Sequence, residues 1–187
     1  MPDCNYAAFA QYAATMTTAS TQRKPGLLAR LFGPRADGMA ALYAAVVAEA
    51  RKPEWYSKYG VPDTLDGRFD MVTLVLCLVL LRLENEGRDR ESVRLTERFV
   101  DDMDGQIREI GFGDLVVGKQ VGGIMSVLGG RLGVYRSGLD SATLERTLWR
   151  GASPSETVIS EALLRAQQIR NELLALDVED ILAGRLA

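Results

Sequence analysis

Histidine is absent from this chain of 187 residues. Its absence excludes mechanisms that need an imidazole base, such as a Ser-His pair, and metal cages that combine Cys with His. The only cysteines, Cys4 and Cys77, cannot complete a four-thiolate zinc site. One lies near the N-terminus and the other inside an apolar run, which favours free thiols in a reducing compartment over a disulfide framework.

Long apolar runs and an excess of positive charge are also missing. The longest apolar run covers residues 71–81, whereas a membrane-spanning helix takes about 20 residues. The net charge of −3 disfavours non-specific nucleic-acid binding. The composition is that of one globular domain. We therefore expect a helical domain over residues 27–187, a flexible tail over residues 1–26, and a cytoplasmic location.

A short apolar segment follows the expected tail. Residues 27–32 read Leu-Leu-Ala-Arg-Leu-Phe and are flanked by Arg23, Lys24 and Arg35. A basic amphipathic segment is suited to peripheral contact with an anionic membrane surface. The other interpretation is that this segment caps the core, and the sequence leaves both open.

Hydrophobic periodicity predicts an all-α fold of six or seven helices around a buried central helix at residues 69–84. Other helices are expected at about 38–51, 91–110, 115–136, 141–150 and 153–176, with a last turn at 178–183. Residues 61–68 are expected to form a loop, and Thr64 or Asp66 to cap the central helix. Ser153 and Glu156 have the spacing of a capping box, with Pro154 at the first helical position.

Carboxylates gather on the helix expected at 91–110. Its apolar face is formed by Leu95, Phe99, Met103, Ile107 and Ile110. Asp101 and Asp104 lie opposite that face, with Asp102 at its edge and Asp114 at the start of the next helix. Oxygen ligands suit Mg²⁺, so one alternative function is a magnesium-dependent enzyme acting on a phosphorylated substrate. Asp104 also has the spacing to pair with Arg108, and a solvated charged face explains the same residues without a metal.

The helix expected at 115–136 is rich in glycine. Small residues recur every four positions at Gly118, Gly122, Ser126 and Gly130. Each glycine costs about 1 kcal/mol relative to alanine in a helix, so repeated glycine indicates a close approach of another helix. Packing in the core is the favoured interpretation, and a homodimer or a partner's helix are the alternatives.

Charged and aromatic side chains crowd the loop before the central helix. Arg68 is predicted to pair with Asp102. We expect a partner-binding surface, because aromatic residues beside charges are typical of interfaces. Its candidate residues are Trp55, Tyr56, Asp63, Asp66, Arg68, Asp102, Asp114 and Lys119. The alternative is that Trp55 and Tyr56 anchor the core while the charges hold loops.

Several segments, taken in order, resemble the ubiquinol–cytochrome c chaperone family. They lie within residues 40–136 and are Glu54-Trp55-Tyr56, the stretches 61–70 and 99–104, the stretch 111–119 and Gly130-Arg131-Leu132. The resemblance implies a helical, non-enzymatic factor in the assembly of respiratory complex III, without a cofactor. Mitochondrial members bind newly made cytochrome b and work with a small partner protein at the ribosome exit.

The chain departs from the family pattern after Lys119, and its arginine and histidine contents add two further expectations. Gly122 and Gly123 follow Lys119 where basic residues are expected, which weakens a positively charged ribosome-binding face. Arginine far outnumbers lysine, which fits an alphaproteobacterial relative, cytoplasmic or peripheral at the inner membrane. Without histidine, such a protein is expected to bind its client's polypeptide and to leave the haem iron to the client's own ligands.

Overall fold

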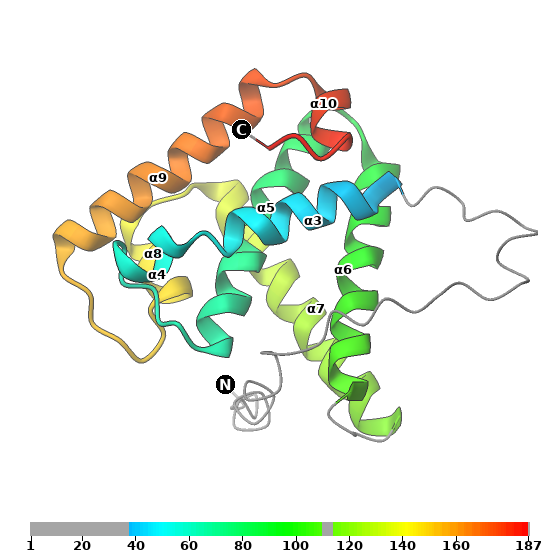
Figure 1. The fold of residues 1–187 in the computed structure, drawn as a ribbon, viewed down its shortest axis with the longest axis horizontal. Coiled ribbons are helices and arrows are strands. Elements are labelled where there is room, and N and C mark those ends of the chain that lie inside the picture. The colour runs from blue at the N-terminus through cyan, green and yellow to red at the C-terminus, as the bar shows by residue number, and fades with distance from the viewer. Residues whose placement is uncertain (1–37, 110–113, 187) are drawn as a thin grey trace, which may run out of the picture.

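The computed structural model describes residues 38–109 and 114–186, and within these ranges the chain is helical with no strand. The all-α prediction is therefore confirmed (Figure 1). The tail at 1–26, the segment at 27–32 and Ile110 lie outside the described residues. The helices are α3 (Gly38–Ala50), α4 (Pro53–Ser57), α5 (Leu65–Asn85), α6 (Asp89–Glu109), α7 (Asp114–Ser137), α8 (Ser141–Leu148), α9 (Glu156–Ala175) and α10 (Val178–Leu182).

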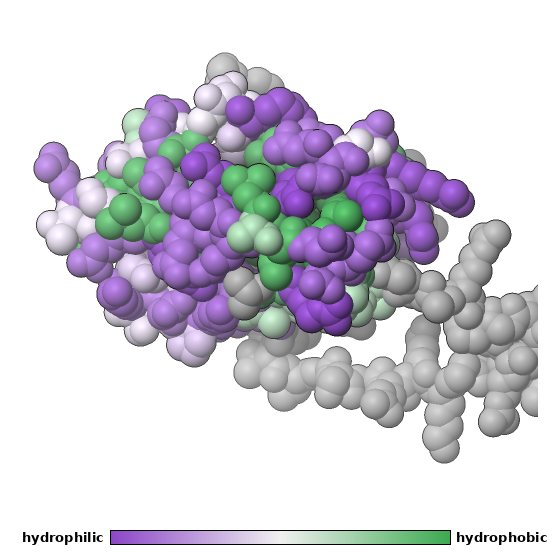
Figure 2. Space-filling view, turned by 90° about the horizontal axis from the view of Figure 1, so that it is seen from above, coloured by the Kyte–Doolittle hydropathy of each residue, from purple (hydrophilic) through white to green (hydrophobic). Residues whose placement is uncertain are grey.

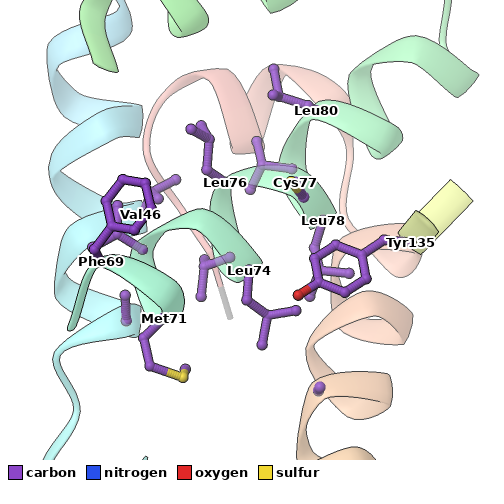
Figure 3. Close-up of a cluster of buried hydrophobic side chains, with 14 of the residues drawn as sticks. Val46, Phe69, Met71, Leu74, Leu76, Cys77, Leu78, Leu80 and Tyr135 are labelled. Atoms are coloured by element: carbon purple, nitrogen blue, oxygen red, sulfur yellow. The ribbon is translucent and has the colours of Figure 1, made fainter. Parts of the chain in front are cut away.

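The apolar run forms the central helix, as the periodicity predicts. α5 contacts α3, α6, α7, α8 and α9, and every residue from Phe69 to Leu80 is buried. Figure 3 shows side chains that leave α5 in all directions, with Val46 of α3 and Tyr135 of α7 packed against them. A helix with neighbours on all sides has no polar face, which explains the nearly continuous apolar sequence. Burial raises the pKa of Cys77 to about 12, so this thiol is protonated at neutral pH and inert.

Two helix starts differ from the predictions. α5 begins at Leu65 rather than Phe69, and Thr64, one of its two predicted caps, accepts a hydrogen bond from the Gly67 amide at 3.2 Å, which confirms that cap. α9 begins at Glu156, and its cap is Ser155, which accepts from the Val158 amide at 3.3 Å. The predicted capping box of Ser153 and Glu156 is therefore wrong. Both serines offer the same chemistry, and only the backbone path decides which one caps.

The apolar faces of α6 and α9 are buried, as the sequence predicts for α6. In α6 the stripe of Leu95, Phe99, Met103 and Ile107 faces the core. In α9 Ile159, Ala162, Ala166, Ile169 and Leu173 are buried, while Leu163 and Leu176 are partly covered.

Buried and partly buried charged side chains join helices that are distant in sequence. Arg131 of α7 and Arg150, beyond the end of α8, both donate to the carboxylate of Asp70 in α5. Arg165 of α9 donates to Glu49 of α3 at 3.0 Å. Arg82 of α5 donates to the carbonyl of Leu173 near the C-terminal end of α9 at 2.9 Å. A charged donor at this end complements the carbonyls that a helix leaves unpaired. None of these pairs was predicted.

Polar side chains cover most of the outer surface. Figure 2 shows a largely hydrophilic face on which exposed apolar side chains form separate patches. Among the described helices, none has the length and hydropathy that a membrane crossing requires.

Candidate functional site

Three predicted binding residues line one surface hollow. Tyr56, Asp63 and Arg68 border a depression of about 590 Å³, together with Arg51, Pro53 and Ser57. The hollow lies where the turn between α3 and α4 meets the loop before α5. These residues are close in sequence, and two consecutive short connections bring them together.

The hollow is held by local hydrogen bonds. The Tyr56 hydroxyl donates to the carbonyl of Ala50 at 2.9 Å, and burial raises its pKa to about 12. Asp63 and Arg68 form an exposed ion pair at 2.6 Å. The hydrogen bond from Arg68 lowers the pKa of Asp63 below its ordinary value. Tyr56, Asp63 and Arg68 are therefore each engaged with a neighbour in the chain.

The predicted pairing of Arg68 with Asp102 is wrong. Arg68 is paired with Asp63, and Asp102 accepts hydrogen bonds from Tyr43 of α3 at 2.8 Å and from Gln106 at 2.7 Å. Burial, followed by the charge of Asp102, raises the pKa of Tyr43. Asp102 therefore joins α6 to α3 rather than to the loop before α5.

We expect Arg68→Ala to lower the free energy of unfolding by less than about 1 kcal/mol, because an exposed ion pair contributes little. A double-mutant cycle with Asp102→Asn should show no coupling, since the two side chains do not meet. Urea unfolding measures both values. Coupling above about 0.5 kcal/mol would contradict the assigned pairs.

The other predicted binding residues do not lie at the hollow. Trp55 is fully buried, with its ring 5.2 Å from that of Tyr59, so it is a core anchor rather than an exposed contact. Asp66 lies in the first turn of α5, and Lys119 is exposed on α7. α7 begins at Asp114 itself, whose side chain lies outside the described ones.

The acidic cluster proposed for Mg²⁺ is not supported. Among the described residues no group of three His, Cys, Asp or Glu side chains is placed to hold a metal ion. Asp101 is exposed, and Asp102 is bonded to Tyr43.

The glycine-rich side of α7 faces outward, so its predicted packing in the core is wrong. Gly118, Gly122, Ser126 and Gly130 are all exposed. At all six described glycines of α7 from Gly118 to Gly133, an added Cβ would meet no atom within 4 Å. We call the exposed residues Gly118, Lys119, Gly122, Met125, Ser126, Gly129, Gly130 and Val134 the α7 outer face. Between Gly118 and Val134 this face carries no carboxylate, and Lys119 is its only base.

An apolar groove beside the α7 outer face was missed in the sequence. It lies between α6 and α7 over the C-terminal part of α5, and its volume is about 400 Å³. Its apolar lining includes Val93 and Val100 of α6, and Met125 and Leu132 of α7. Each pair is spaced by seven residues, which places its members on one side of a helix. This spacing, away from the main apolar stripe of α6, was the available signal.

The described helices thus present an open glycine-rich face on α7 and an apolar groove beside it. Residues 57–187 match the family described as Ubiquinol-cytochrome C chaperone. The chain belongs to this family. Family members are chaperones in the assembly of respiratory complex III, which agrees with the resemblance noted above. The match reaches the C-terminal helices and begins after Glu54-Trp55-Tyr56.

A solved structure supports the same assignment. The chain is similar to the Cbp3 homolog from Brucella abortus, with 26% sequence identity and a TM-score of 0.69. The similarity covers 86% of this chain and 96% of that chain. No curated protein matches the chain. Family and fold therefore agree on a helical complex III chaperone with a protein client.

Proposed function

We propose that this protein binds cytochrome b, the membrane subunit of complex III, during its biogenesis, and that the α7 outer face contacts the client. Family membership supports the role as a chaperone. The observation that supports the surface is the open glycine-rich side of α7, which nothing else in the described chain uses. The protein acts by binding rather than by catalysis.

The glycines of α7 carry a cost that the described fold does not recover. Six glycines within one helix cost on the order of 5 kcal/mol relative to alanine. Inside a core, such a cost is offset when two backbones approach closely. Here the space above each glycine is open, so the close approach belongs to a partner outside the described chain.

The chemistry of the α7 outer face favours an apolar partner. Met125 and Val134 are 37% and 42% exposed, and glycine and serine fill most of the remaining face. Methionine adapts its shape to different apolar surfaces, which suits a chaperone. With Lys119 as its only base, the face offers little attraction to ribosomal RNA.

We expect Gly122→Leu to reduce the recovery of cytochrome b at least about fivefold when the tagged protein is crosslinked and purified from its native organism. A leucine at this position blocks the close approach of a helix. A loss of about 1 kcal/mol in binding free energy corresponds to a roughly fivefold loss in affinity. The fold should persist, because leucine favours helix and the space is open.

The matched control is Gly105→Leu. Gly105 is also an exposed helical glycine with no atom within 4 Å of an added Cβ, but it lies on α6. Recovery with this variant should equal that of the wild type. Failure of the wild type to recover cytochrome b or another complex III subunit would remove the client.

A homodimer through the α7 outer face is the second candidate. The same open glycines favour it, and light scattering separates the two. A wild-type dimer that Gly122→Leu converts to a monomer would assign the face to a second copy. An unchanged mass, together with reduced client recovery, would assign it to the client.

A further inference from the structure

The groove between α6 and α7 combines an apolar floor with an acidic rim. Leu80, Val93, Val100, Met125 and Leu132 provide apolar lining, and Val93 is 56% exposed. Glu84, Glu97 and Asp101 provide the carboxylates, and no lysine or arginine lines the groove.

Of the three carboxylates, the two on α6 are available to a ligand. The third, Glu84 of α5, is paired with Arg136 of α7 at 2.8 Å. Glu97 and Asp101 are exposed, and neither forms an ion pair with a described residue. They are four positions apart on α6 and so lie on the same side of the helix. The groove therefore has a pair of carboxylates at its α6 edge.

The α7 edge of the groove permits a close approach of another helix. At 100° per residue, Gly122, Met125 and Gly129 lie within about 60° of one another around α7. The glycines of this edge have open space above them. From Gly118 to Leu132 the edge is about 21 Å long, at 1.5 Å per residue. A helix of about 14 residues matches this length.

We propose that the groove binds the cytoplasmic end of a transmembrane helix of the client, with its apolar residues on the floor and its flanking Lys or Arg against Glu97 and Asp101. This inference rests on the proposed function and adds the chemistry of the segment bound. Transmembrane helices carry an excess of Lys and Arg at their cytoplasmic ends. An acidic rim therefore selects that end over the opposite one, where basic residues are fewer.

One segment of the chain itself has similar chemistry. Residues 27–32 are apolar except for Arg30 and are flanked by Arg23, Lys24 and Arg35. It is a competing occupant, and the experiment must separate it from the client.

The test measures the binding of two labelled peptides to the full chain by fluorescence anisotropy. Both contain the same 14-residue helix of Leu, Ala and Gly, with two flanking Lys in one and two flanking Glu in the other. We expect the Lys-flanked peptide to bind at least about tenfold more tightly. Its two flanking charges are attracted by Glu97 and Asp101, whereas those of the Glu-flanked peptide are repelled. Equal affinity would overturn the proposal.

Charge reversal at the rim tests the site itself. Glu97→Lys with Asp101→Lys should abolish or invert the preference between the two peptides. The matched control is Glu145→Lys with Glu161→Lys, which makes the same change in net charge at exposed positions on α8 and α9. A preference that changes equally in both double variants would reflect net charge alone and would overturn the proposal.

The competing occupants give different results. Binding that appears only in the full chain carrying Leu28→Asp and Phe32→Asp would assign the groove to residues 27–32 and overturn the proposal. A wild-type dimer that the rim variant dissociates would assign it to a second copy, with the same consequence. If cytochrome b is recovered from the native organism while neither peptide binds, only the groove is excluded. If the Lys-flanked peptide binds but no complex III subunit is recovered, cytochrome b is excluded as the client and the groove remains a binding site.

Discussion

Asp70→Ala is expected to lower the free energy of unfolding by about 3–5 kcal/mol, because it leaves a buried guanidinium group without its counter-charge. Asp70 is 1% exposed, and Arg131 is 7% exposed. Arg150 donates to the same carboxylate at 2.6 Å and 2.9 Å. The carbonyl of Thr147 is 3.3 Å from Arg131 and compensates only part of its charge. Chemical denaturation followed by circular dichroism measures the loss.

Two further variants separate the buried charge from a general loss of packing. Burial raises the pKa of Asp70 although both guanidinium groups oppose the rise, so the removal of this carboxylate from water is unfavourable to folding. Asp70→Leu combined with Arg131→Met should therefore recover a large part of the loss. The control is Glu84→Ala, which removes an exposed pair with Arg136 and should cost less than about 1 kcal/mol. A similar small loss for Asp70→Ala would contradict the structural role of the cluster.

Gly67→Ala is expected to lower the free energy of unfolding by about 1–3 kcal/mol, although alanine is the better helix former by about 1 kcal/mol. A Cβ at Gly67 would lie 2.0 Å from the carbonyl oxygen of Pro62 and 3.0 Å from its carbon. Both atoms belong to the backbone and cannot move aside as a flexible side chain can. The loop before α5 must shift, and the cap between Thr64 and the Gly67 amide is lost with it.

Gly105→Ala is the matched control for this clash. Gly105 is also helical, but nothing lies within 4 Å of an added Cβ. The substitution should raise the free energy of unfolding by up to about 1 kcal/mol. The two variants should thus change stability in opposite directions in the same unfolding experiment. A gain in stability for Gly67→Ala would show that the loop does not pack on α5 as described.

Periodicity was sufficient to predict the helices but not all of their ends. The spacing of Leu95, Phe99, Met103 and Ile107 predicted the buried face of α6 because one side of a helix must meet the core. The start of α5 was missed because Asp66, Gly67 and Arg68 interrupt the apolar pattern after Leu65, and the continuous apolar run begins only at Phe69. The start of α9 was missed because the chain offers two serines that can cap, and sequence spacing favoured the wrong one.

The candidate site was predictable where it depends on residues close in sequence. Tyr56, Asp63 and Arg68 line one hollow because a short loop joins α4 to α5. The pairing of Arg68 with Asp102 was wrong because Tyr43 of α3 reaches Asp102. That contact depends on the packing of α3 against α6, which local sequence does not encode.

Composition, apolar periodicity and ordered motifs were enough to predict an all-α chain, a central helix without a polar face and membership of the chaperone family. The tertiary structure alone decided that Asp70 meets two arginines 61 and 80 residues away. It also decided that the glycines of α7 face outward beside an apolar groove rather than into the core. The physical reason is that periodicity defines which side of a helix is apolar or small. Which helix covers that side, and which side remains open to a partner, depends on how all the helices pack together.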